Sequence, residues 1–146
     1  MKKFITTIIV SVLAIATVSA RNIYSRNVSD LPTPAQTTLD LNFKAKVSVI
    51  KIEKGFTGIS EYDVVLTDGT EITFDRDGYW TDIEVAYGKK VPDSMVPKTI
   101  LDYIKANNQN KKIIGIEKNR NTYDIQLENG IEMKFDRAGN FLRYDD

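Results

Sequence analysis

The feature that most constrains this chain is an internal repeat. Nine of nineteen positions are identical when residues 62–80 (YDVVLTDGTEITFDRDGYW) are set over residues 123–141 (YDIQLENGIEMKFDRAGNF). The similarity extends upstream, where an Ile-Glu-Lys triplet occurs at 52–54 and again at 116–118. Self-similarity of this kind is the signature of a duplicated structural unit. The sequence therefore predicts two copies of one fold, residues 31–90 and residues 91–146.

Each copy has the pattern of one helix followed by antiparallel strands. Apolar residues at helical spacing predict a helix in each copy: Ala35, Leu39 and Phe43 in the first, and Val96, Ile100 and Ile104 in the second. Tyr62, Val64 and Leu66 then alternate with polar residues, which is typical of a half-buried strand. Asp68-Gly69 and Asn129-Gly130 supply two-residue turns that favour hairpins. The predicted unit is one helix plus a four-stranded meander.

A unit of about 55 residues buries too little surface to be more than marginally stable alone, so we expect the two units to share one sheet. The prediction is an α+β fold, a tandem duplication of a helix plus a four-stranded antiparallel meander. Its two helices pack on one face of a continuous sheet of about eight strands. The opposite face is predicted to be polar and open.

The first twenty residues predict a signal peptide. Lysines at positions 2 and 3 precede an uncharged apolar run at 4–18, and Val18-Ser19-Ala20 is a small-residue cleavage site. A retained membrane anchor is the alternative, but the run is about 15 residues, short of the roughly 20 that span a bilayer. We therefore expect a periplasmic or secreted protein with no membrane span after cleavage. Residues 21–30 lack periodicity and are predicted to be a flexible tail.

The composition excludes several classes of enzyme. The chain contains no His and no Cys, which removes serine triads, thiol nucleophiles and the usual zinc sites. Glu71 and Glu132 occupy equivalent outward strand positions and offer a carboxylate pair for acid–base work, but a solvated polar face explains them more simply. There is no basic cluster for nucleic acid. We expect no enzyme, no cofactor and no nucleic-acid partner.

The repeated motifs carry a family resemblance. Leu31-Pro32, a helix, Tyr62-Asp63-Val64, Asp68-Gly69-Thr70-Glu71-Ile72 and Gly78-Tyr79-Trp80, followed by a second round from Val91-Pro92, resemble the PepSY-like family of exported proteins with a beta-lactamase-inhibitor-like fold. The resemblance implies a non-enzymatic module of the cell envelope. Related folds bind and inhibit a hydrolase or peptidase through the open sheet face and its loops, and the family brings no catalytic residues.

Four residues are candidates for binding a partner, an envelope or extracellular protein. Phe56 and Ile59 lie in a glycine-flanked loop of the first copy, and Tyr79 and Trp80 follow a turn glycine; exposed aromatic residues are common interface anchors. Two alternatives stay open. Trp80 aligns with Phe141 and can be a core residue, and the Phe56–Ile59 loop can fold back as a lid over the sheet edge.

The predicted function is an exported, non-catalytic binding module, inhibitor-like towards a hydrolase or peptidase, that acts through the open sheet face. The alternative is a calcium- or ligand-binding structural protein of the cell envelope. Residues 73–84 approach the spacing of a calcium-binding loop, but Thr73 is wrong at its first position and the flanks are predicted strands rather than helices. We therefore interpret this segment as a hairpin turn.

Overall fold

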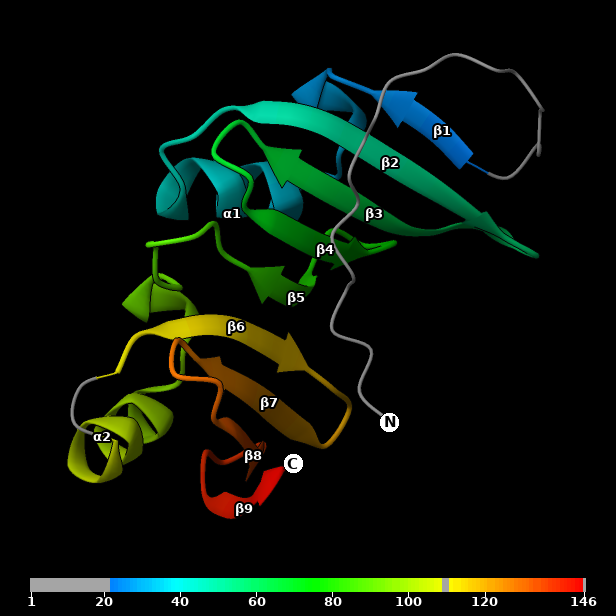
Figure 1. Ribbon diagram of the computed structural model, residues 1–146. Coiled ribbons are helices and arrows are strands. Elements are labelled where there is room, and N and C mark those ends of the chain that lie inside the picture. Colours follow the sequence, from blue (N-terminus) through cyan, green and yellow to red (C-terminus); the bar gives the residue numbers. More distant parts are fainter. Residues whose placement is uncertain (1–21, 109–110, 146) are drawn as a thin grey trace.

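The structure is a computed structural model that describes residues 22–108 and 111–145 (Figure 1). These residues form two α-helices, two short 3-10 helices and nine strands, in the order β1 (Asn22–Ser25), η1 (Val28–Asp30), α1 (Thr33–Asn42), β2 (Val47–Gly55), β3 (Gly58–Leu66), β4 (Glu71–Asp75), β5 (Trp80–Glu84), η2 (Asp93–Met95), α2 (Lys98–Asn107), β6 (Ile113–Lys118), β7 (Thr122–Leu127), β8 (Glu132–Asp136) and β9 (Phe141–Asp145). The predicted signal peptide, residues 1–20, lies outside the described residues.

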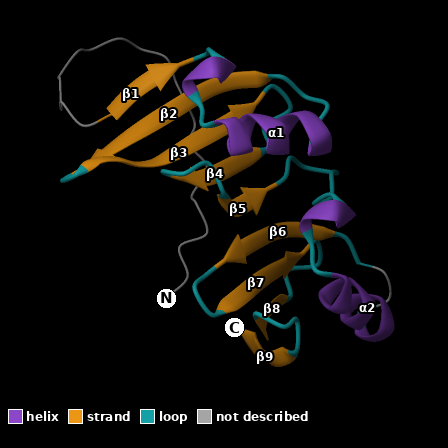
Figure 2. Ribbon diagram, turned by 180° about the vertical axis from the view of Figure 1, so that it is seen from behind, coloured by secondary structure: helices purple, strands orange, loops and turns teal. Residues whose placement is uncertain are grey.

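The nine strands form a single antiparallel sheet, and their order across the sheet is their order in the sequence. Both α-helices lie on the same face of this sheet, α1 beside the first strands and α2 beside the last (Figures 1 and 2). The predicted α+β class is confirmed, with nine strands in place of about eight. Each α-helix is followed by four strands, α1 by β2 to β5 and α2 by β6 to β9.

The core lies between the helices and the sheet. Ala35 and Leu39 of α1 and Ile100 and Ile104 of α2 are buried, as their helical spacing predicts. The fully buried side chains from the strands include Ile50, Val64, Leu66, Ile72, Phe74, Ile83, Ile116, Ile125, Leu127, Met133 and Phe135. Alternate residues of a strand point to opposite faces, so the residues between these core positions lie on the face that carries no helix.

The two halves use the same contact to hold each helix against the sheet. Gly78 closes the β4–β5 turn with a φ of 89°, and Gly139 closes the β8–β9 turn with a φ of 87°. A Cβ atom at Gly78 would lie 2.7 Å from Cβ of Pro32, and one at Gly139 would lie 2.9 Å from Cβ of Thr99. Only glycine fits both this backbone conformation and the space left beside the start of each helix.

The prediction of a flexible tail at residues 21–30 is wrong for the part that the structure describes. Residues 22–25 form β1, which pairs antiparallel with β2 from Asn22↔Glu53 to Ser25↔Ile50. Residues 28–30 form η1, capped by the side chain of Asn27. Hydropathy could not reveal β1, because its side chains are mostly exposed and the strand is held by backbone hydrogen bonds to the edge of β2.

Candidate binding face

A row of polar side chains crosses the helix-free face from β2 to β6. The strand register places Lys51 opposite Asp63, Asp63 opposite Thr73, Thr73 opposite Asp82, and Asp82 opposite Glu117. Paired residues on one face of a sheet are direct neighbours. The row therefore runs without interruption from the first half of the molecule into the second.

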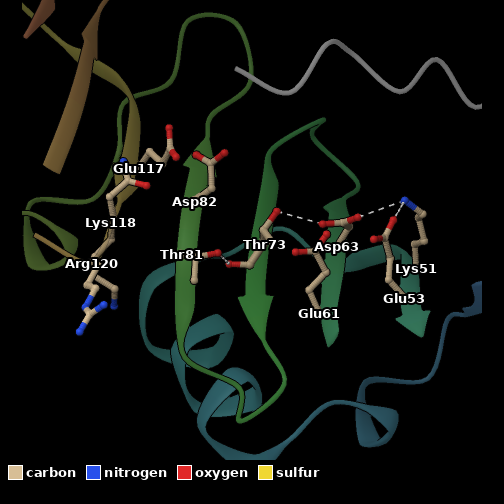
Figure 3. Close-up of a pocket in the computed structure, with 11 residues that line it drawn as sticks. Lys51, Glu53, Glu61, Asp63, Thr73, Thr81, Asp82, Glu117, Lys118 and Arg120 are labelled. Carbon is tan, nitrogen blue, oxygen red and sulfur yellow. Dashed lines mark hydrogen bonds and ion pairs between the residues drawn. The ribbon is translucent and has the colours of Figure 1, made fainter. Parts of the chain in front are cut away.

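This row forms the floor of a groove. The groove has a volume of about 530 Å³ and is lined by Lys51, Glu53, Glu61, Asp63, Thr73, Thr81, Asp82, Glu117, Lys118, Asn119 and Arg120. The carboxylates come from β2, β3, β5 and β6, whereas Lys118 and Arg120 lie at the β6 end (Figure 3). Five carboxylates against three cations make the groove acidic at neutral pH.

Lys51 organises the β2–β3 side of the groove. Its ammonium group contacts the carboxylate of Glu53 and lies 3.4 Å from Oδ2 of Asp63. The hydroxyl of Thr73 donates a hydrogen bond of 3.0 Å to Oδ1 of Asp63. Asp63 is therefore held from both neighbouring strands, and its position is fixed by the register of β2, β3 and β4.

Two carboxyl groups of the groove hold their protons unusually tightly. Burial raises the pKa of Glu61 to about 7, and the hydrogen bond with Glu53 and the charge of Asp63 add to the effect. Burial also raises the pKa of Asp82 to about 7, reinforced by the charges of Glu117 and Glu84. The groove therefore changes its charge near neutral pH.

The equivalent face of the second half has balanced charges. Asp124 on β7 corresponds to Asp63 in the repeat and is 3 % exposed. It lies 3.3 Å from Nζ of Lys134 on β8 and accepts a hydrogen bond of 2.9 Å from Asn119. Lys134 stands where the first half has Thr73, so a cation replaces a hydroxyl at this point. The acidic groove is consequently a property of the first half and its junction with β6.

None of the four predicted partner-binding residues lines the groove. Phe56 is at the turn of the β2–β3 hairpin and its side chain is fully exposed, with Ile59 38 % exposed on the same hairpin. Phe56 therefore does not fold back as a lid. Tyr79 is 60 % exposed, whereas Trp80 is half-buried against the core, with Nζ of Lys118 4.2 Å from its ring centroid. A binding role for these four residues stays a prediction.

Glu71 and Glu132, the carboxylates considered for acid–base work, cannot act on one bond. They lie on β4 and β8, four strand spacings apart, which corresponds to roughly 19 Å. Paired catalytic carboxylates of glycosidases are within about 10 Å of each other. The segment 73–84 is a hairpin of β4 and β5, so it also lacks the helical flanks of a helix–loop–helix calcium site.

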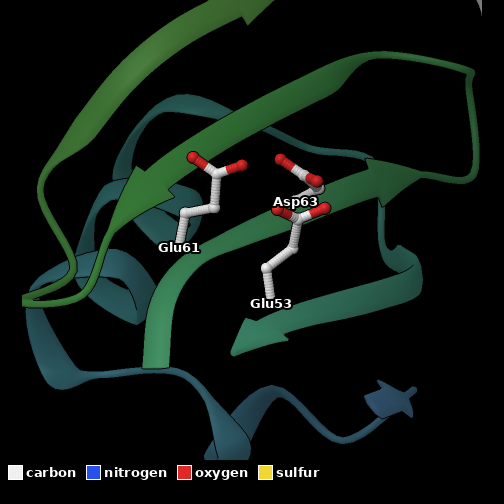
Figure 4. A group of neighbouring side chains, drawn as sticks. All are labelled: Glu53, Glu61 and Asp63. Atoms are coloured by element: carbon white, nitrogen blue, oxygen red, sulfur yellow. The ribbon is translucent and has the colours of Figure 1, made fainter. Parts of the chain in front are cut away.

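One group of carboxylates has the spacing of a cation site. Oxygen atoms of Glu53, Glu61 and Asp63 all lie within 4.8 Å of one another (Figure 4). Carboxylate oxygens are the ligands that Ca²⁺ prefers. Sequence reasoning missed this group, because Glu53 and Glu61 meet only through the register of β2 and β3, which includes a shift between Glu53 and Lys54.

Comparison with known proteins places the fold in a family. Residues 60–143 match the model of the family described as "Putative beta-lactamase-inhibitor-like, PepSY-like". The chain belongs to this PepSY-like family. The matched region contains β4 to β8 completely, so the predicted resemblance is confirmed. No curated protein matches the chain significantly.

Solved structures of Bacteroides proteins are similar over nearly their whole length. A "putative periplasmic protein of unknown function" from Bacteroides vulgatus is 40% identical with a TM-score of 0.80, covering 86% of this chain and 99% of its own. Another "putative periplasmic protein" from B. vulgatus is 32% identical with a TM-score of 0.79, covering 88% and 100%. A "putative calcium-regulated periplasmic protein" from Bacteroides thetaiotaomicron is 28% identical with a TM-score of 0.79, covering 86% and 97%.

These relatives confirm the predicted location of this PepSY-like protein. The solved neighbours are described as periplasmic, and the protein is accordingly assigned to the periplasm. Within residues 22–108 and 111–145, no helix is long and apolar enough to cross a membrane.

Proposed function

We propose that this PepSY-like protein is a non-catalytic binding module of the periplasm that holds a partner protein against the helix-free face of its sheet. The observation that carries the proposal is the groove of about 530 Å³ on that face. Its floor is built from charged side chains on rigid, paired strands, a kind of surface that presents fixed polar groups to another molecule. Both α-helices cover the opposite face, so a partner has access to the groove.

The chemistry of the chain supports binding without catalysis. With no His and no Cys, thiol nucleophiles and imidazole bases are missing, so neither a thiol nor an imidazole can take part in catalysis. The family description, with its inhibitor-like label, supports a partner of the hydrolase or peptidase class. In this proposal the β2–β3 hairpin presents Phe56 to the partner beside the groove.

We also propose that the two halves arose by tandem duplication and that only one of them kept the binding face. The nine identities between the copies and the equivalent glycines at the helix starts support the duplication. The charge difference supports the division of roles, because Lys134 neutralises Asp124 in the second half where the first half leaves an acidic groove.

Site-specific photo-crosslinking of the protein in the periplasm of intact cells tests this proposal. A photoreactive phenylalanine at position 56 or 73 is expected to give one discrete adduct, identified by mass spectrometry, because Thr73 lines the groove and Phe56 lies at the tip of the hairpin whose Glu53 and Glu61 line it. The same residue at position 102 or 105, on the exposed side of α2, is the matched control. The charge-reversing substitution Glu117→Lys should weaken the adduct from position 73. Equal adducts from the groove and α2 positions, or none from the groove, would refute the proposal.

A second candidate function is calcium binding at Glu53, Glu61 and Asp63. Their carboxylate oxygens lie within 4.8 Å of one another, and a relative from B. thetaiotaomicron is described as calcium-regulated. Lys51 already supplies a positive charge to Glu53 and Asp63. Calcium binding at this point therefore requires the Lys51 ammonium group to move away.

Thermal unfolding with and without calcium tests the second candidate. A site that binds the folded protein stabilises it by about 2.7 kcal/mol at a hundredfold excess over Kd, so the unfolding midpoint should rise with Ca²⁺ and less with Mg²⁺. Glu61→Gln should abolish the rise, whereas Glu132→Gln on the second half should preserve it. Superimposable curves for calcium, magnesium and chelator would contradict calcium binding in the millimolar range or below.

A further inference from the structure

Lysines gather at the end of the sheet where the two halves of the chain are joined. The loop after β5, the last turn of α2 and the beginning of β6 lie together at this end (Figure 1). A pocket of about 180 Å³ opens there, and its lining includes Lys90, Lys105, Lys111 and Lys112. Lys89 precedes Lys90 in the same loop, and all five side chains are exposed. We call these five residues the lysine surface, which the fold assembles from three separate segments.

Carboxylates neutralise this surface only in part. Oδ1 of Asp93 lies 3.0 Å from Nζ of Lys90. The carboxylate of Glu128 accepts a hydrogen bond of 3.1 Å from the backbone N–H of Lys112. Within residues 22–108 and 111–145, the other three lysines of the surface form no ion pair. The lysine surface therefore carries a net positive charge at neutral pH.

Apolar groups accompany the lysines. Four further side chains that line the pocket are Val91, Leu101, Ile104 and Ile113. Tyr87, in the loop just before Lys89, has a fully exposed side chain. The carbonyl oxygen of the next residue, Gly88, lies 3.5 Å from Nζ of Lys112, so this loop lies against the lysine surface. The positive charge thus surrounds an exposed aromatic ring.

A surface with lysines around an exposed tyrosine has the chemistry of a contact with a lipid bilayer. Lysines are attracted to anionic phosphate groups at a membrane surface, and each one strengthens binding roughly fivefold. Tyrosine is enriched at the boundary between lipid and water, because its ring is apolar and its hydroxyl group is polar. The related periplasmic proteins place this chain in a compartment that membranes enclose.

We propose that the lysine surface docks this protein on a bilayer containing anionic phospholipid, with Tyr87 at the boundary between headgroups and acyl chains. This inference does not depend on what the groove binds. Phosphate groups of the headgroups contact the five lysines, whose flexible stems let the ammonium groups reach them. The apolar lining of the pocket lies behind these lysines, on the side away from water.

The acidic groove fixes how the docked protein is oriented. Groove residues Thr81 and Asp82 belong to the beginning of β5, and Glu117 and Lys118 to the end of β6. The lysine surface lies at the opposite ends of these two strands. An anionic bilayer attracts the lysine surface and repels the acidic groove. The docked protein therefore keeps the groove turned away from the membrane and open to the periplasm.

Co-sedimentation with lipid vesicles tests the proposal on protein purified from the periplasm. The protein is expected to bind vesicles of equal parts phosphatidylcholine and phosphatidylglycerol, and to bind vesicles of phosphatidylcholine alone far less. Raising sodium chloride from about 0.1 M to about 1 M shortens the screening length from about 10 Å to about 3 Å, and should release the protein. Tyr87→Ser should weaken binding without changing its dependence on salt.

Two double variants of equal net charge separate the lysine surface from charge in general. Lys111→Gln with Lys112→Gln should weaken binding to the mixed vesicles roughly thirtyfold, from fivefold per lysine. Lys54→Gln with Arg76→Gln removes two exposed cations from the turns at the other end of the sheet and should leave binding nearly unchanged. Lys89→Gln with Lys105→Gln provides the same test should the first double variant fail to fold.

Four results would each overturn the proposal. The first is a lack of binding to the mixed vesicles. The second is equal binding to the two kinds of vesicle, and the third is an equal loss in the lysine-surface variant and its control. The fourth is release of the protein from the mixed vesicles by an equimolar single-stranded oligonucleotide, which would identify a surface for nucleic acid instead.

Discussion

Substitution of Gly78 by alanine tests how the first helix is held against the sheet. Gly78 has a φ of 89°, in the left-handed region that L residues avoid. The new Cβ atom would lie 2.7 Å from Cβ of Pro32 and 3.1 Å from the backbone N of Ala35. Both are rigid parts of the chain at the beginning of α1, so no side-chain rotation relieves the contact. The β4–β5 turn and the helix must move apart.

The expected loss has two parts. The left-handed conformation costs alanine about 1 kcal/mol relative to glycine, and overpacking against fixed atoms costs about 1–3 kcal/mol more. Gly130→Ala is the matched control, because Gly130 has a φ of 86° but no atom within 4 Å of its virtual Cβ. We therefore expect Gly130→Ala to lower the free energy of unfolding by about 1 kcal/mol and Gly78→Ala by roughly 2–4 kcal/mol.

Urea unfolding followed by circular dichroism measures both variants under one condition. Gly139→Ala, at the equivalent turn beside Thr99, should lower the free energy of unfolding about as much as Gly78→Ala does, and more than the control Gly130→Ala does. The decisive comparison is between positions of nearly equal φ. If Gly78→Ala proves no less stable than Gly130→Ala, the close contact with α1 is not what fixes this turn, and the packing argument fails.

Three further substitutions separate the core, the hairpin tip and the charged pair of the second half, all measured by urea unfolding. Phe74→Ala removes a fully buried side chain and should lower the free energy of unfolding by about 3–5 kcal/mol. A loss below about 1 kcal/mol would mean that the surrounding side chains close the cavity, contrary to this expectation. Phe56→Asp alters a fully exposed side chain and should change stability by no more than about 0.5 kcal/mol, unless the hairpin packs on something. Lys134→Met leaves the buried Asp124 without its cation and should cost about 3 kcal/mol at pH 7; a neutral result would mean that Asn119 alone suffices for Asp124.

Much of the fold follows from the sequence because its signals are local. Asp68-Gly69 and Asn129-Gly130 place two hairpins, and the alternation around Val64 and Ile125 says which side chains are buried. The predicted helices are also present, as α1 from Thr33 to Asn42 and α2 from Lys98 to Asn107. These features depend on residues a few positions apart, for which spacing and turn chemistry are informative.

The groove depends on distant residues and was not predictable in the same way. In the sequence, Glu53, Asp82 and Glu117 each look like ordinary outward-facing residues of a strand. Only the order of the strands and the register of β5 with β6 bring them to one groove. The sequence does carry one indication of the groove: many of the outward-facing strand positions of the first copy are occupied by Asp or Glu. Strand β1 was missed for a related reason, because pairing at a sheet edge uses backbone groups and needs no apolar pattern.

The consecutive order of the strands bears on how the chain acquires its structure after crossing a membrane. Every described strand pairs with a neighbour in sequence, so each new hairpin closes a short loop, and contacts of low sequence separation form rapidly. A polypeptide threaded outward from its N-terminus can thus complete the first half before the last strands have emerged. The pairing of β5 with β6, which needs residues from both halves, would be among the later contacts to form.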